Sequence, residues 1–286
     1  MIKDILNLKK TIKEELQDFT DIAILGLSGG VDSLVTSCLL VEALGSENVY
    51  TIHMPYSDTD MIEGRFNGNS LKIAEKIKAI SLVRPISGLV NALDNTIITK
   101  NLLDKKELSS NLSKLNHGNS RARARMSMLY GLGYHLEESL KKRVRVIGTG
   151  NLSEDYIGYD SKFGDSAWDL CLIGELLKSE VYQLAEHFAD IGLIEKNMID
   201  YHPSAGLWEG QSDEEELGYS YAAMEPSILK TRNPETGLAY RGYEIPVAGI
   251  NRTPLSEVDT FVLNRHFKNR HKHMAPPVIK LREFCE

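Results

Sequence analysis

The chain contains little cysteine, and none of it is paired in sequence. The three cysteines are Cys38, Cys171 and Cys285, which are far apart, and there is no CxxC pair. An odd number of widely separated cysteines predicts neither a zinc site nor a disulfide framework. We therefore expect three reduced thiols that are buried or incidental.

Long apolar runs and an excess of basic residues are also missing. No run approaches the ~20 apolar residues that a membrane-spanning helix needs. Residues 1–16 carry charges throughout and lack the apolar centre of a signal peptide. The net charge of −7 disfavours general nucleic-acid binding, because nucleic acids bind to basic surfaces. We expect a cytoplasmic protein with no membrane partner and no nucleic-acid partner.

The bulk composition is that of an ordinary globular chain. It has 286 residues, of which 42% are hydrophobic and 26% are charged, so it can bury a sizeable core. Internal repeats and low-complexity tracts are absent from the sequence. We expect residues 1–286 to form a single domain. The proline- and glycine-rich stretch 225–255 predicts an irregular excursion or lid within it.

Apolar strand patterns alternate with helical ones along the chain. Strands are predicted at 21–27, 49–55, 81–86 and 142–151. The predicted helices are 3–18, a segment that ends near Leu44, 71–80, 88–95, 100–116, 119–138 and 258–270. This alternation predicts an α/β fold with a doubly wound parallel sheet of the Rossmann type. Ligands of such sheets bind at the carboxyl ends of the strands, where the loops after Leu27, Met54 and Ile147 should converge.

The segment SGGVDS, residues 28–33, is the most informative part of the sequence. It lies between an apolar strand and a helix. Gly29 and Gly30 allow unusual backbone angles and a close approach of a ligand, while Ser28 and Ser33 add hydroxyl donors. The first N–H groups of a helix lack internal partners, and the helix dipole favours an anion there. The segment therefore predicts a phosphate-binding loop, although a plain Ser/Gly helix cap is the alternative.

Asp32 makes the expected ligand more specific. A carboxylate beside phosphates usually needs a metal ion between them. The loop also lacks the GxxxxGK[ST] pattern of a Walker A motif. We therefore expect a nucleotide polyphosphate that binds together with magnesium.

A second group of candidate residues follows the strand at 142–151. Thr149 offers a neutral hydrogen-bonding group, and Glu154 and Asp165 are candidate carboxylates. Glu154 could join Asp32 on magnesium, because this ion prefers oxygen ligands. Taken alone, Glu154 could equally be an acid in the first turn of a helix. Lys162 and Lys178 could be ordinary surface lysines.

Three further segments contain candidate binding residues. Arg121, Arg123 and Arg125 lie near a predicted helix start, where their charge opposes the helix dipole. A bound anion would compensate them, and a solvated basic face is the alternative. SDEEELG predicts a helix with Ser212 as N-cap in a capping box, and the turn before it could bring Ser204 near a ligand. His271 and Lys272 lie in a basic C-terminal segment.

Taken in order, these segments resemble the ammonia-dependent NAD synthetases, which belong to the PP-loop ATP pyrophosphatases. The resemblance covers about residues 20–280. The segments that carry it are SGGVDS (28–33), GNSRARARMSMLY (118–130), GTGNLSE (148–154), KFGDSAWD (162–169), GELLKSEV around Lys178, PSAGLWEGQSDEEELG (203–218) and HKHMAPP (271–277). The fold that the resemblance implies is the adenine nucleotide alpha hydrolase type.

The resemblance implies a reaction and a set of partners. The carboxylate of nicotinic acid adenine dinucleotide would attack the α-phosphate of ATP, and ammonia would convert the resulting adenylate to NAD. ATP and Mg²⁺ are the implied cofactors. The family acts as a homodimer, and the helix at 119–138 is a candidate for the contact. The chain shows no room for a glutaminase domain, so ammonia would be free or delivered by a separate protein.

The resemblance also implies roles for individual residues. The reaction centre would contain Asp32, Asp165 and Lys178, and the metal ligands would be Asp32 and Glu154. The residues implied to bind ATP are Ser28, Gly29, Gly30, Asp32, Ser33, Thr149, Lys178, Ser204, His271 and Lys272. Arg123, Arg125 and Tyr130 would face the dinucleotide.

Some positions depart from the family pattern. The family loop KYGDGGAD is KFGDSAWD here, which introduces Ser166 and Trp168, and His53 stands where the family often has arginine. These departures keep a second hypothesis open, namely an AMP-forming amide ligase of the same fold that acts on another carboxylic acid. A non-catalytic nucleotide sensor is disfavoured, because Asp32, Glu154 and Lys178 are chemically competent.

Overall fold

A parallel sheet lies at the centre of the molecule. The computed structural model describes residues 1–56, 68–97, 113–200, 202–203, 211–239 and 255–274. Within them, five strands have the order β3-β2-β1-β4-β5, and every neighbouring pair is parallel. The strands are β1 (Ile22–Gly26), β2 (Val49–His53), β3 (Ile80–Val83), β4 (Val144–Gly148) and β5 (Leu170–Cys171). This order confirms the predicted doubly wound α/β fold.

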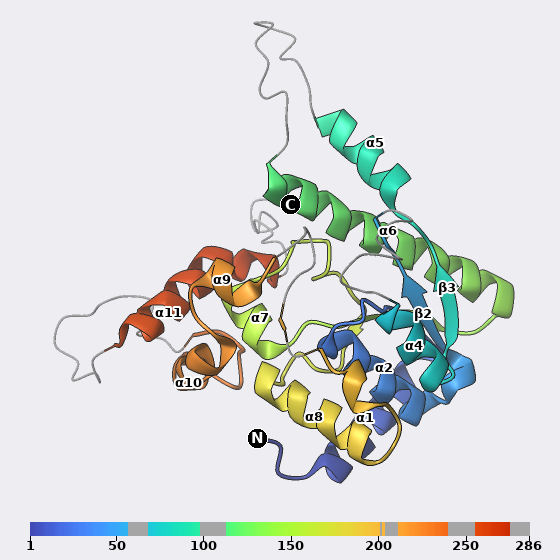
Figure 1. Cartoon of the computed structure of the whole chain (residues 1–286), viewed down its shortest axis with the longest axis horizontal. Coiled ribbons are helices and arrows are strands. Elements are labelled where there is room, and N and C mark those ends of the chain that lie inside the picture. The colour runs from blue at the N-terminus through green and yellow to red at the C-terminus, as the bar shows by residue number, and fades with distance from the viewer. Residues whose placement is uncertain (57–67, 98–112, 201, 204–210, 240–254, 275–286) are drawn as a thin grey trace, which may run out of the picture.

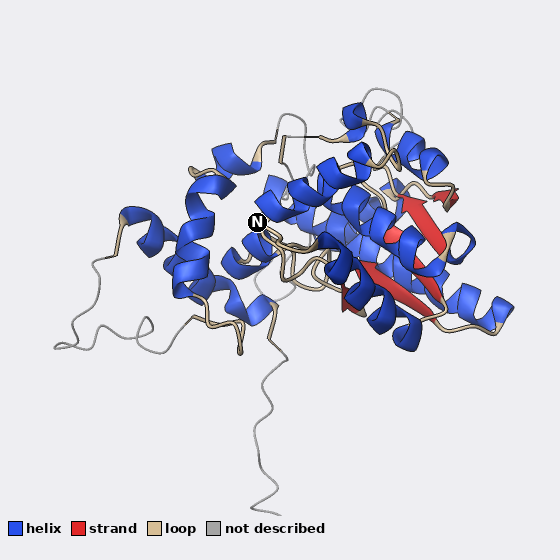
Figure 2. Ribbon diagram, turned by 90° about the horizontal axis from the view of Figure 1, so that it is seen from below, coloured by secondary structure: helices blue, strands red, loops and turns tan. Residues whose placement is uncertain are grey.

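Helices cover both faces of the sheet (Figures 1 and 2). One face carries α1 (Ile5–Phe19), α2 (Val31–Leu44) and α8 (Lys178–Asp190), and the other carries α6 (Lys114–Leu140) beside α5 (Ser87–Ile97). The remaining helical segments near the sheet are η1 (Ser46–Asn48), α4 (Asn69–Lys76) and η2 (Lys196–Met198). None of the helices in the described ranges is long and apolar enough to cross a membrane.

Helix α2 occupies the centre of one apolar core. Its sequence is apolar on all sides, and Leu34, Val35 and Cys38 are fully buried, as expected for a helix that is enclosed by other elements. It packs against α1 and α8 as well as the sheet. Gly45 ends the helix at φ +85°, in the region that favours glycine. The core thereby fixes the start of α2, where the phosphate-binding loop lies.

A helical group flanks the carboxyl edge of the sheet. It contains α7 (Leu152–Ile157), α9 (Asp213–Leu217), α10 (Tyr221–Thr231), α11 (Glu257–Asn269) and η3 (Arg270–Lys272), and it forms the left part of Figure 1. Ile157, Met224 and Val262, from three of these helices, share an apolar core. This group brings residues from the last third of the chain next to the strand ends.

Several sequence-based boundaries need correction. Residues 225–231 are not irregular, because they belong to α10, where buried Met224 and Ile228 hold the helix despite Pro226. Residues 240–254 of the predicted excursion lie outside the described residues, as do residues 100–112 of the predicted helix 100–116. The predicted helix 119–138 is longer, since α6 begins at Lys114. Ser212 is the N-cap of α9, but its side chain makes no capping hydrogen bond.

Candidate active site

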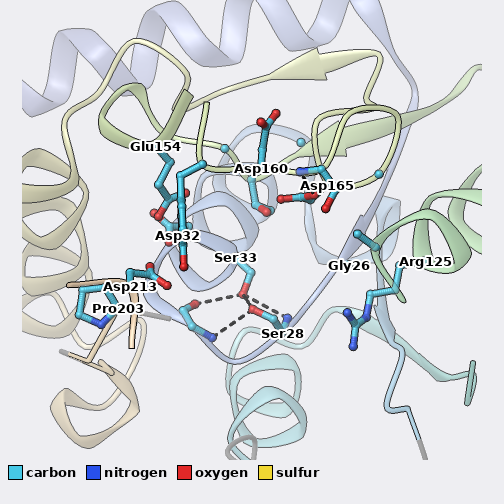
Figure 3. Close-up of a pocket in the computed structure, with 18 of the residues that line it drawn as sticks. Gly26, Ser28, Asp32, Ser33, Arg125, Glu154, Asp160, Asp165, Pro203 and Asp213 are labelled. Carbon is cyan, nitrogen blue, oxygen red and sulfur yellow. Dashed lines mark hydrogen bonds between the residues drawn. The ribbon is translucent and has the colours of Figure 1, made fainter. Parts of the chain in front are cut away.

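A cavity of about 560 Å³ opens at the carboxyl ends of β1, β2 and β4 (Figure 3). The ends of these strands contribute Gly26, His53 and Gly148 to its wall, and the helical group contributes Asp213 and Lys272. This is the edge at which parallel sheets bind their ligands. The predicted convergence of the loops after Leu27, Met54 and Ile147 is therefore confirmed.

The phosphate-binding loop is held in shape by its own hydroxyl groups. The Oγ atoms of Ser28 and Ser33 are 3.0 Å apart, and the Ser33 hydroxyl donates to the Gly30 carbonyl at 3.0 Å (Figure 3). Gly29 has φ +90°, in the region that favours glycine. Gly30, the N-cap of α2, offers no side chain to the first N–H groups of the helix. The loop therefore places the N-terminus of α2, with its helix dipole, at the cavity wall.

Lys178 links the two predicted metal ligands. Its Nζ atom lies 2.6 Å from Asp32 Oδ2 and 2.8 Å from Glu154 Oε1, and its side chain is only 4% exposed. Asn151, the N-cap of α7, donates from Nδ2 to Asp32 Oδ1 at 2.9 Å. All three charged groups line the cavity beside the phosphate-binding loop. The structure thus brings together residues that are far apart in the sequence.

Burial and mutual interaction shift the titration of this group. Burial raises the pKa of Glu154 to about 8, while Lys178 acts in the opposite direction. Burial alone would lower the pKa of Lys178, but Asp32 and Glu154 outweigh it and raise that pKa above its usual range. Lys178 is therefore a permanent cation between two carboxyl groups at neutral pH.

Asp213 is a third acid on this side of the cavity that sequence reasoning missed. It is 2% exposed, and Tyr221 donates from its hydroxyl to Asp213 Oδ2 at 3.1 Å. Its charge contributes to the raised pKa of Glu154. In the sequence, Asp213 belongs to the motif SDEEELG, which predicts a helix start and accounts for its acids without a ligand.

A second acidic group lies on the wall formed by the loop after α7. Asp165 Oδ1 accepts from the Ser161 backbone N–H at 2.8 Å, and burial and the charge of Asp160 raise its pKa. Asp160 pairs with Lys272 at 3.3 Å and with His273 at 3.1 Å. Asp155, also missed from the sequence, has its pKa raised to about 7, chiefly by burial. Figure 3 shows Asp160 and Asp165 on the side of the cavity opposite Asp213.

Lys272 joins the C-terminal segment to this wall. Its Nζ atom donates to the carbonyl oxygens of Gly158 and Asp160, both at 2.7 Å. Its neighbour His271 is exposed and lies outside the cavity lining, where its carbonyl accepts from Lys162 Nζ at 2.8 Å. Thr149 lines the cavity as expected. Ser204 lies outside the described residues.

The end of the cavity at β2 is more apolar. Ile52, Met54 and Leu129 line it, and Arg125 Nε donates to the Met54 carbonyl at 3.2 Å. His53 is 2% exposed, and its Nε2 atom lies 2.7 Å from Ser81 Oγ. Burial lowers the pKa of His53 to about 4, so its ring is neutral at physiological pH. This end suits a flat, uncharged group such as a nucleobase.

His53 should make folding sensitive to acid. The unfolded chain takes up the imidazole proton near pH 6.5, whereas the folded protein does so only near pH 4. The contribution of neutral His53 to the free energy of unfolding is therefore fully present above about pH 6.5. It should fall by about 2 kcal/mol as the pH drops towards about 4.5. Urea unfolding of wild type and His53→Asn at both pH values measures this loss. The variant should lose less on acidification, whereas His202→Asn, at a 96% exposed side chain, should behave as wild type. An equal loss in His53→Asn and wild type would refute the assignment.

Besides His271, the cavity lining lacks three residues with predicted roles, Gly29, Arg123 and Tyr130, and it also lacks the substituted position Trp168. Arg123 is exposed, and its Nε atom donates to the Lys162 carbonyl at 3.3 Å. Tyr130 donates to Asp169 Oδ1 at 3.2 Å. Trp168 packs against the backbone of Gly148, where a Cβ atom would come within 2.4 Å of its ring. Trp168 therefore does not narrow the cavity, and this departure gives no reason to expect a different acid.

The carboxylate oxygens beside the phosphate-binding loop fit some of the ligand positions of a hard divalent cation. Asp32 and Glu154 supply carboxylate oxygens of the kind that magnesium prefers. In the described part of the chain, no group of three His, Cys, Asp or Glu residues is arranged to hold a metal ion. Magnesium on a nucleotide is usually bound by one or two protein carboxylates. Water and phosphate oxygens fill its remaining coordination positions.

The fold and the site together define an α/β nucleotide-binding enzyme of the PP-loop type. The profile of the NAD synthase family matches residues 4–275. The chain therefore belongs to the NAD synthase family.

Sequence relatives agree with this assignment over almost the whole chain. The chain is 36% identical to an NH(3)-dependent NAD(+) synthetase of Methanosarcina acetivorans, which covers 91% of both chains. It is 33% identical to the protein of the same name from Methanocaldococcus jannaschii, with 96% of both chains covered.

Solved structures show the same fold. An NH3-dependent NAD synthetase from Campylobacter jejuni has a TM-score of 0.64 at 26% identity and 96% coverage of both chains. An NMN synthetase from Francisella tularensis has a TM-score of 0.70 at 24% identity, again with 96% of both chains covered. The second likeness supports the fold alone.

Proposed function

We propose that the protein forms NAD by ammonia-dependent amidation of nicotinic acid adenine dinucleotide, with ATP converted to AMP and pyrophosphate. One observation carries the proposal. Lys178, Asp32 and Glu154 meet beside the phosphate-binding loop in the cavity that also contains Asp165 and Lys272. The names of the curated relatives support the same reaction.

The first half of the reaction is adenylation. The N–H groups at the start of α2 and the hydroxyls of Ser28 and Ser33 would hold the phosphates of ATP. An oxygen of the nicotinate carboxylate attacks the α-phosphorus, and the bond to pyrophosphate breaks. Lys178 stabilises the charge that develops on the phosphate oxygens. The apolar end of the cavity, near His53 and Met54, would take the adenine ring.

The second half is amide formation. The nitrogen of ammonia attacks the carbonyl carbon of the adenylate, the bond to AMP breaks, and the nitrogen loses a proton. Asp165 suits the acceptor role, because burial and the Asp160 charge raise its pKa and thus its affinity for a proton. Exclusion of water from the cavity during the reaction would protect the adenylate from hydrolysis. No covalent enzyme intermediate is needed.

Magnesium is the proposed metal partner. Asp32 and Glu154 would hold it, and it would neutralise the charge of the triphosphate. Roles for Ser204, His271, Arg123 and Tyr130 stay predictions, as do a single domain, a cytoplasmic location and delivery of ammonia by another protein.

The decisive experiment is an assay of NAD formation by the purified protein. With nicotinic acid adenine dinucleotide, ATP, Mg²⁺ and an ammonium salt, we expect NAD and AMP in equal amounts. Release of pyrophosphate with another acid, such as nicotinic acid mononucleotide, together with no NAD from the dinucleotide, would instead establish the alternative ligase activity.

We also propose that the protein is a homodimer that pairs through α5 and α6. Leu89, Leu93 and Ile97 recur at helical spacing on α5 and are 40% to 52% exposed, as is typical of a helix face that a partner covers. Leu93→Asp should place a charge in this contact and convert the dimer to a monomer, as measured by sedimentation. Leu6→Asp, at an exposed leucine of α1, should remain dimeric. An unchanged mass for Leu93→Asp would exclude this face.

A further inference from the structure

The ammonium group of Lys178 fills the place between the two carboxylates proposed to bind magnesium. It lies within 2.8 Å of an oxygen from each of Asp32 and Glu154. Its side chain is 4% exposed, and each carboxyl side chain is 18% exposed. The ammonium group therefore already forms ion pairs with the two carboxyl groups that a metal ion would need as ligands.

The acidic residues around Lys178 require a cation among them in the nucleotide-free protein. Asp32 and Asp213 lie close enough to Glu154 that their charges help to raise its pKa. Partly buried carboxylates without a counter-ion are strongly destabilising. Lys178 supplies the counter-charge from within the chain.

The backbone at Lys178 is held by hydrogen bonds, so only its side chain can change its ion-pair partners. Its backbone N–H donates to Ser153 Oγ at 2.9 Å, and the next backbone N–H, of Ser179, donates to Glu225 Oε1 at 3.0 Å. Glu225 also accepts from the Ser153 hydroxyl at 3.0 Å. These buried bonds fix the first turn of α8. The four-carbon side chain is flexible by nature, so its ammonium group can move while its anchor stays in place.

A divalent cation and Lys178 compete for the same oxygens until phosphate arrives. A metal ion that enters alone must either displace the ammonium group, leaving it buried without a partner, or lie beside a like charge. A triphosphate changes this balance, because its oxygens offer Lys178 new partners and offer the metal ion further ligands.

We propose that Lys178 is an exchangeable internal counter-ion that excludes a divalent cation from Asp32 and Glu154 until the nucleotide triphosphate binds. Metal and nucleotide therefore bind cooperatively, and the metal ion does not bind first. The proposal rests on the proposed function only in taking a nucleotide triphosphate as the ligand of the loop.

Binding of Mn²⁺ without nucleotide tests the proposal. Free Mn²⁺ is measured by electron paramagnetic resonance in titrations of wild type, Lys178→Met and Lys178→Gln. We expect weak binding by wild type and binding at least about tenfold tighter by both variants, since a coupling of this kind typically spans about 5- to 150-fold. Lys230→Met is the matched control, because Lys230 also pairs with a carboxylate, Asp259, at 2.6 Å but lies outside the cavity lining. It should bind Mn²⁺ as wild type does.

Thermal unfolding gives a second, independent measurement. Mn²⁺ should raise the Tm of Lys178→Met and Lys178→Gln more than that of wild type, because the ion replaces the missing counter-charge. A non-hydrolysable ATP analogue should tighten Mn²⁺ binding to wild type by at least about tenfold, a measurement that does not depend on the variants folding.

Two results would overturn the proposal. One is Mn²⁺ binding by the variants that is no tighter than that of wild type. The other is tight binding of Mn²⁺ to wild type without nucleotide. Neither measurement uses an acid substrate, so a failure to form NAD would refute the proposed reaction and leave the counter-ion proposal standing.

Discussion

Asp32→Ala is expected to lower the rate of NAD formation by about a thousandfold or more while the protein remains folded. The substitution removes a proposed metal ligand and a partner of Lys178 at 2.6 Å, and losses of this size are typical when a group that stabilises transition-state charge is removed. Asp32 lies in the first turn of α2 at the cavity wall and contributes little to the core. Steady-state rates with saturating ATP, Mg²⁺ and ammonium measure the effect.

The control for this variant is Asp190→Ala, at an exposed aspartate that ends α8. It should retain the wild-type rate. Circular dichroism and thermal unfolding should show that Asp32→Ala keeps its secondary structure. A near-normal rate in Asp32→Ala would remove Asp32 from the reaction centre and with it the proposed metal site.

Gly158→Ala is expected to have the largest effect on stability, a loss of about 3 kcal/mol. Gly158 ends α7 at φ +63°, and a Cβ atom there would lie 2.2 Å from Cβ of Asn269 on α11. Strain in the left-handed region adds to the cost of moving α11 away. Because Lys272 donates to the Gly158 carbonyl, the shift should also disturb the cavity wall and lower activity. Urea unfolding and the NAD assay measure the two effects.

Gly192→Ala is the control that measures backbone strain without a steric clash of the kind that Gly158→Ala makes with Asn269. Gly192 has φ +75°, but no atom lies within 4 Å of the position of an added Cβ. Its substitution should cost only about 1 kcal/mol and leave the NAD assay unchanged. If the two variants lost equal stability, the contact between α7 and α11 would not be tight.

The phosphate-binding loop could be predicted because its physics is local. A strand, two glycines, two serines and a helix lie within one short segment, and each contributes to binding through backbone angles or N–H groups. The main strands could be predicted for the same reason, since their apolar patterns are continuous. β5 was missed, because two residues, Leu170 and Cys171, are too short to show a period.

The acidic residues were harder to predict because their role depends on tertiary packing. Asp155 and Asp213 look like ordinary helix-start acids in sequence, where carboxylates favour the helix dipole. Only the packing of α7 and α9 around the cavity buries them. The direct pairing of Lys178 with Asp32 was missed as well, because it joins residues 146 positions apart.

The same long separations affect how the protein folds. The strand order β3-β2-β1-β4-β5 places early and late strands together, and Lys272 reaches a carbonyl 114 positions earlier in the chain. Contacts of this kind give a high contact order, and loops of this length cost entropy that is recovered only late in folding. During refolding, secondary structure should therefore return well before the ability to bind nucleotide.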